Sequence, residues 1–79
     1  MNEGLDLFRP ECLARNIRRF RMQRGLTRVQ LARELYVTAQ NVYKWETGKT
    51  SPSAANLYML SRALQISADQ LLNCSETAQ

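Results

Sequence analysis

Apolar residues near the start of the chain recur at intervals of four and three, the spacing of one face of an α-helix. Leu13, Ile17 and Phe20 form this stripe within the segment from Glu11 to Arg24. Gly25 follows directly, and glycine ends a helix at low cost because it readily adopts the left-handed conformation. The pattern predicts a first helix over residues 11–24, with several arginines on its outer face.

Two helix-start signals follow in close succession. Thr27 and Gln30 have the spacing of a capping box, in which each side chain satisfies a free backbone N–H at a helix start. They predict a second helix over about residues 28–35. Thr38 is the next good N-cap and Gly48 the next helix end, which predicts a third helix between them. Because only about three residues connect the second and third helices, we expect a tight, crossed pair.

The C-terminal third of the chain predicts two more helices. Pro52 suits the first turn of a fourth helix. The buried stripe of that helix is expected to contain Leu57, Leu60, Ala63 and Leu64. Ser67 and Gln70 repeat the capping-box spacing, and Leu71 and Leu72 provide a short fifth helix with residues to bury.

These segments together predict an all-α, five-helix fold with no strand. A chain of 79 residues can fill one hydrophobic core, so we expect a single domain over residues 11–72. Residues 1–10 are expected to form a flexible lead-in and residues 73–79 a flexible tail, because both ends are polar and lack helical periodicity.

The positive charge is concentrated in one part of the chain. The whole sequence carries +4, but residues 9–49 contain ten basic and three acidic side chains and therefore carry +7. The flanking segments are both slightly acidic. Such a distribution is typical of a surface that meets the phosphates of nucleic acid.

Several other classes of protein are disfavoured by what the chain contains. Cys12 and Cys74 lie near opposite ends, and there is no histidine to complete a ligand set, so we predict two free thiols, no metal site and no cofactor. No glycine-rich phosphate loop or nucleophile with an adjacent base is present, and an enzyme is not expected. Neither a signal peptide nor a membrane-spanning stretch is apparent, so we expect a cytoplasmic protein that does not bind membranes.

The segment LTRVQLARELYVTAQNVYKWETGKTSP, residues 26–52, is more specific than the helix pattern. It resembles the lambda-repressor and Cro-like family of helix-turn-helix regulators, also called the xenobiotic-response-element family. The matching positions are Leu26, Thr27, Leu31, Ala32, Leu35, Val37, Thr38, Val42, Trp45, Glu46, Gly48, Lys49 and Pro52. The resemblance implies a lambda-repressor-like fold and a transcriptional regulator that binds double-stranded DNA in a sequence-specific way.

Packing accounts for part of this segment, because its apolar residues are needed to hold the second and third helices together. Ala32 must be small where the two helices cross, and Val37 and Val42 fill the space between them. Trp45 supplies the largest single apolar area and is interpreted as a core residue rather than a base-stacking one.

The outward face of the third helix carries groups that can read base edges. Gln40 and Asn41 can pair with adenine, Lys44 with guanine, and Ala39 can meet a thymine methyl group. The family places its base-reading side chains chiefly at Ala39, Gln40 and Lys44, with Asn41 and Tyr43 beside them. Ala39 replaces a frequently polar residue, so Gln40 and Lys44 are expected to carry more of the sequence preference. The alternative is an ordinary solvated helix face.

Basic and hydroxyl residues around the third helix are candidates for binding phosphate. They are Arg28, Thr38, Thr47, Lys49 and Thr50. Arg28 opens the second helix, where free N–H groups and the helix dipole favour an anion. Three further arginines either contribute at longer range or are simply solvated. They are Arg18, Arg19 and Arg24.

The resemblance also implies a salt bridge between Arg21 of the first helix and Glu46 at the end of the third. Arg21 follows the apolar stripe at Phe20, so its guanidinium can reach inward, and Glu46 follows Trp45. The family usually has glycine in the turn between the second and third helices, where this chain has Tyr36. Tyr36 is therefore expected either to adopt a strained left-handed conformation or to alter the turn.

One such domain makes few base contacts, so a homodimer on a pseudo-palindromic operator is expected, with its interface near Leu71 and Leu72. We expect no small-molecule effector domain, which favours a repressor or a compact regulator of the phage, plasmid or restriction-control type. An alternative is an antitoxin or transcription bridging factor that works mainly through a protein partner.

Overall fold

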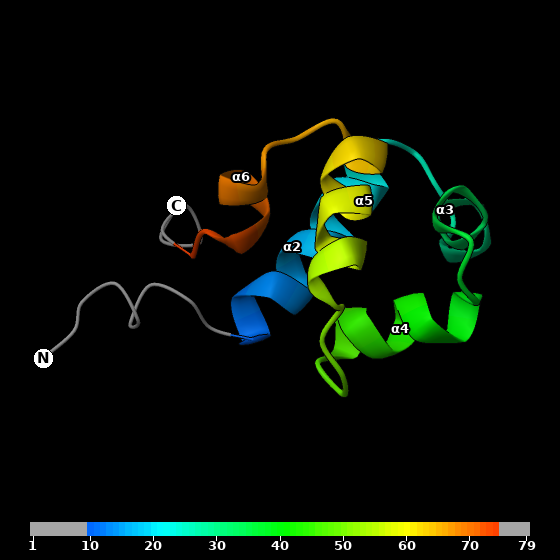
Figure 1. Cartoon of the computed structure of the whole chain (residues 1–79), viewed down its shortest axis with the longest axis horizontal. Helices are drawn as coiled ribbons and strands as arrows, with labels where there is room; N and C mark the ends of the chain where they lie inside the picture. The colour runs from blue at the N-terminus through cyan, green and yellow to red at the C-terminus, as the bar shows by residue number, and fades with distance from the viewer. Residues whose placement is uncertain (1–9, 75–79) are drawn as a thin grey trace, which may run out of the picture.

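The computed structural model describes residues 10–74 and consists there of five α-helices without a strand (Figure 1). The helices are α2 (Pro10–Gln23), α3 (Arg28–Leu35), α4 (Ala39–Thr47), α5 (Ala54–Leu64) and α6 (Ala68–Leu72). The predicted all-α, five-helix fold is thereby confirmed. Most of the predicted lead-in and tail lies outside the described residues, although Pro10 is already the first residue of α2.

Four hydroxyl side chains fix where the helices begin. Thr27, Thr38, Ser53 and Ser67 are N-caps, and each accepts a hydrogen bond from the backbone N–H three residues later. The capping boxes predicted at Thr27 and Ser67 are both present. Pro52 was expected within the first turn of α5, but Ser53 is the cap, and Pro52 lies buried just before it.

The core joins residues from all five helices around Ile17 of α2. Ile17, Leu31, Leu60 and Leu71 are completely buried, and Trp45 is 5% exposed. Leu71 therefore fills the core of its own monomer, so its side chain is not available for contact with a second copy. Leu72 is half-buried and packs against the same core.

Asn16, in the middle of α2, connects α2 to α6. Its side chain is completely buried, and its Nδ2 donates to the backbone oxygens of Leu71 and Asn73, both at 2.9 Å. The end of a helix leaves carbonyl groups without partners, and here the side chain of a neighbouring helix supplies the donor. This polar contact fixes α6 against α2.

A disulfide joins the same two regions and corrects the prediction of free thiols. Cys12 lies in the first turn of α2 and Cys74 just after α6, and their Cα atoms are 5.3 Å apart. The two cysteines are 62 residues apart in the sequence, so only the packing of α6 on α2 brings them together. Spacing along the chain carried no signal of this contact.

Tyr36 adopts a left-handed conformation in the turn after α3, at a conformational cost. Its φ of 59° and ψ of 39° lie in the left-handed region, and its backbone N–H caps the end of α3. The side chain is 89% exposed, so it offsets little of the roughly 1–2 kcal/mol that this conformation costs a non-glycine residue. Of the two predicted outcomes, the structure shows the strained left-handed residue.

None of the five described helices has the length and apolar character needed to cross a membrane.

Candidate nucleic-acid interface

The helix α4 lies against both α2 and α3 and divides into an inner and an outer face. Val42 and Trp45 point into the core, as predicted for scaffold residues. Between α3 and α4 the chain turns at Tyr36, so the two helices form the tight pair expected from their short connection (Figure 1). This packing leaves one side of α4 facing solvent.

The exposed side of α4 carries most of the side chains predicted to read bases. Gln40, Asn41 and Tyr43 are exposed, and Lys44 is half-buried. Ala39 differs, because it is half-buried and packs against the core. The structure therefore places four of the five candidates on one accessible surface and leaves Ala39 at its edge.

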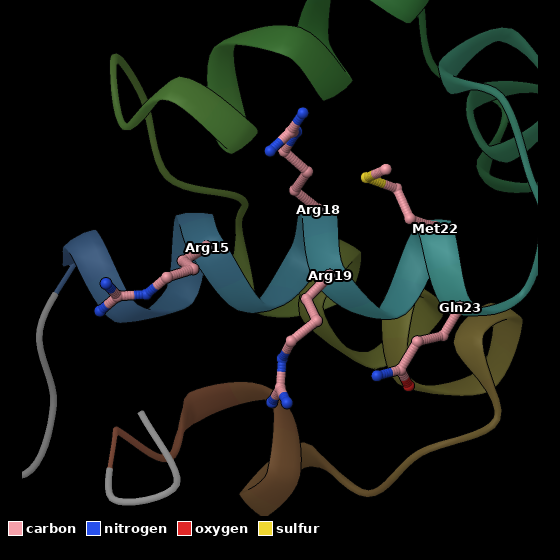
Figure 2. Close-up of a pocket in the computed structure, with 5 residues that line it drawn as sticks. All are labelled: Arg15, Arg18, Arg19, Met22 and Gln23. Carbon is pink, nitrogen blue, oxygen red and sulfur yellow. The ribbon is translucent and has the colours of Figure 1, made fainter. Parts of the chain in front are cut away.

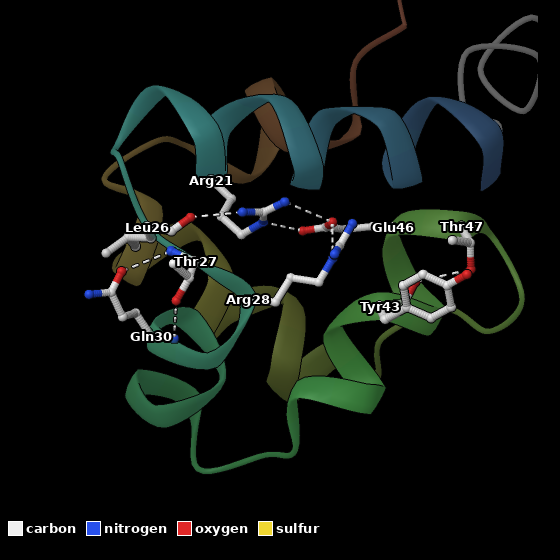
Figure 3. Close-up of polar contacts among 8 residues, drawn as sticks. All are labelled: Arg21, Leu26, Thr27, Arg28, Gln30, Tyr43, Glu46 and Thr47. Atoms are coloured by element: carbon white, nitrogen blue, oxygen red, sulfur yellow. Dashed lines mark hydrogen bonds and ion pairs between the residues drawn. The ribbon is translucent and has the colours of Figure 1, made fainter.

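A buried carboxylate holds α4 to α2. Arg21 Nε lies 2.6 Å from Glu46 Oε2 and Arg21 Nη2 lies 3.2 Å from Glu46 Oε1, so the predicted ion pair is present and bidentate (Figure 3). The side chains are only 9% and 1% exposed. Arg21 Nη1 also donates to the backbone oxygen of Leu26 at 2.8 Å, which ties the end of α2 to the loop before α3.

Arg28 gives Glu46 a second cationic partner, which the sequence analysis missed. Its Nε donates to Glu46 Oε1 at 2.9 Å, so one carboxylate receives three N–H groups from two arginines. Figure 3 shows Arg28 reaching from the start of α3 to Glu46. With two positive charges on one carboxylate, the cluster of Arg21, Glu46 and Arg28 keeps a net charge of +1 at the junction of three helices.

The guanidinium of Arg28 also lies close to the ring of Tyr43, with 5.3 Å between its Cζ atom and the ring centroid. The arginine side chain is 38% exposed, and its Nε is the atom bonded to Glu46. The Nη1 and Nη2 groups have no hydrogen bond to any residue from 10 to 74, and their planar geometry suits an anion. Arg28 is therefore both a structural partner of α4 and a candidate phosphate ligand.

The other predicted phosphate ligands differ in how they are engaged. Lys49 and Thr50 are exposed in the loop after α4. Thr38 is the exposed N-cap of α4 and accepts a hydrogen bond from the backbone N–H of Asn41 at 3.1 Å. The hydroxyl of Thr47 donates to the Tyr43 carbonyl at 3.0 Å, so it must rotate before it can donate to a phosphate (Figure 3).

The fold and this interface define a helix-turn-helix domain, with α3 and α4 as its helix pair. A helix-turn-helix family model matches residues 17–71, which is more than half of the chain. The chain therefore belongs to the lambda-repressor and Cro-like family of helix-turn-helix regulators.

Three relatives illustrate the match. The chain is 35% identical over 60 residues to the HTH-type transcriptional activator BcrR of Enterococcus faecalis, covering 76% of this chain but only 29% of that protein. The P22 c2 repressor, crystallised with a synthetic operator, is 33% identical with a TM-score of 0.73, covering 76% of this chain and 91% of its own. The restriction-modification controller C.AhdI of Aeromonas hydrophila is 25% identical with a TM-score of 0.75, covering 80% and 96%.

Proposed function

We propose that the chain binds double-stranded DNA through α4 and regulates transcription from a nearby promoter. The observation that carries this proposal is the exposed polar side of α4, with Gln40, Asn41 and Lys44 on a helix that the buried Glu46 holds in place. A recognition helix in this motif enters the major groove, where amide and ammonium groups discriminate between base pairs. The cluster of positive charge between residues 9 and 49 favours the phosphates on either side.

The likeness to an operator-bound repressor and to a transcriptional activator supports a role in transcriptional regulation. Whether the bound chain represses or activates would follow from the position of its operator. A site that overlaps the polymerase-binding region blocks transcription. We propose repression of this kind, by the chain bound directly to its operator.

Sequence preference is tested by selecting duplexes from a random DNA library and then replacing Gln40 or Lys44 with Ala. Either substitution should weaken binding to the selected site by about 1–3 kcal/mol while largely sparing non-specific DNA, because it removes a base contact. Lys49→Ala serves as the control, since loss of a phosphate contact should weaken binding to all duplexes alike. Unchanged affinity of both α4 variants for the selected site would contradict the proposed orientation of α4.

We further propose that two copies bind a pseudo-palindromic operator, with half-site centres about one helical turn of DNA apart. The small contact surface of one α4 supports this proposal, because a second copy doubles the base contacts. Footprinting on the selected duplex should show two related half-sites, and sedimentation should show two chains per duplex. A single chain protecting an asymmetric site would exclude the dimer.

A further inference from the structure

Four arginines lie on the outer side of α2 or directly after it, and the protein itself engages three of them. Arg15 Nη2 donates to Cys12 Sγ at the start of α2, at 3.7 Å. The guanidinium of Arg19 lies 4.6 Å from the centroid of an aromatic ring, and Arg24 donates to a backbone carbonyl near the end of α5. Arg18 is exposed and has no hydrogen bond or ion pair with any residue between 10 and 74.

The direction of Arg18 also distinguishes it from its neighbours. Figure 2 shows Arg18 leaving α2 on the side of α4, whereas Arg19 leaves it on the side of α6. Arg18 precedes Arg21 by three residues, so the two project from adjacent positions on one side of α2. Arg21 uses that side to reach Glu46, and Arg18 therefore lies on the side of α2 that faces α4.

Among residues 10–74, no carboxylate forms an ion pair with Arg18. Glu46 is 1% exposed and already receives hydrogen bonds from Arg21 and Arg28. Beyond it, α4 leads into the exposed loop that carries Lys49 and Thr50. Arg18 on α2 and Lys49 in this loop are thus two exposed cations on the elements that flank this side.

We propose that Arg18 binds a phosphate of the DNA backbone beside those met by Lys49 and Thr50, so that the DNA contact extends from the helix-turn-helix onto α2. This inference rests on the proposed DNA-binding function. The planar guanidinium suits a phosphate, and a side chain with no hydrogen bond or ion pair among residues 10–74 gives up none of these when it binds one. A partner other than DNA, such as an acidic protein, would leave DNA binding independent of Arg18.

The test compares Arg18→Gln with Arg15→Gln, because both variants remove one exposed positive charge from α2. Affinity for a short mixed-sequence duplex is measured between about 50 and 200 mM salt. Loss of one phosphate contact should reduce the slope of log affinity against log salt by about 0.9, so the advantage of the wild type over Arg18→Gln should shrink about 3.5-fold across that range. Arg15→Gln should keep the wild-type slope.

Phosphate ethylation of a duplex selected by the wild-type protein locates the contact. One ethylated phosphate that interferes with the wild type should cease to interfere with Arg18→Gln, while Arg18→Lys should retain the wild-type salt slope. Equal slopes and identical interference for Arg18→Gln and Arg15→Gln would overturn this inference and leave the proposed function intact. If the wild type bound no duplex at all, the proposed function and this inference would both fail.

Discussion

Replacing Glu46 with Ala is expected to lower the free energy of unfolding by about 3–5 kcal/mol, because it leaves a buried arginine without its counter-ion. Arg21 is 9% exposed and directs two N–H groups at the Glu46 carboxylate, so water cannot easily replace that partner. The intact pair need not add much net stability, since desolvation offsets its attraction. Chemical denaturation of the wild type and the variant measures the difference.

The same substitution should reduce operator affinity although Glu46 is buried. Arg28 would lose the bond that holds its Nε, and α4 would lose its anchor to α2. Glu46→Gln is the matched variant: it keeps the shape of the side chain but removes the charge and replaces one acceptor oxygen with an amide donor, so it should recover only part of the loss. A Glu46→Ala protein with wild-type stability would contradict the role assigned to this carboxylate.

Reducing the Cys12–Cys74 disulfide is expected to cost about 4 kcal/mol of stability, because the bond closes a loop over a separation of 62 residues and restricts the unfolded chain. For a domain of this size, that change corresponds to a fall in melting temperature of roughly 15–30 °C. Small domains have only a few kcal/mol of net stability, so the reduced protein should be close to unfolding. Thermal melts with and without a dithiol reductant measure the effect.

The control for this experiment is the double variant in which Cys12 and Cys74 are both replaced by Ser. It should melt near the reduced wild type and should not respond to the reductant, because it has no bond to break. A wild-type protein whose melting temperature is the same with and without reductant would show that the disulfide does not contribute to stability.

The helices could be predicted from the sequence because their signals are local. Thr27, Thr38 and Ser67 lie within three residues of the backbone N–H groups that they cap, so a short window contains the whole interaction. The position of Pro52 shows the limit of such signals. A proline suits both the first turn and the residue before the cap, and Ser53 decided between these alternatives.

The parts of the site that were not predicted depend on contacts between distant segments. The one such contact that was predicted, between Arg21 and Glu46, was expected from a family resemblance and not from spacing. Arg28 is 18 residues from Glu46, and both had already been assigned other roles. The burial of Asn16 likewise depends on where α6 packs, which no periodicity in α2 reveals.

The disulfide also determines how a pulling force would travel through the domain. Cys12 and Cys74 lie near the two ends of the described region, so a load applied at those ends passes from one to the other through a single covalent bond. The helices between them, including α3 and α4, lie outside this path and carry little of the tension. Pulled at both ends, the domain bears the load in this bond without distortion of its recognition helix.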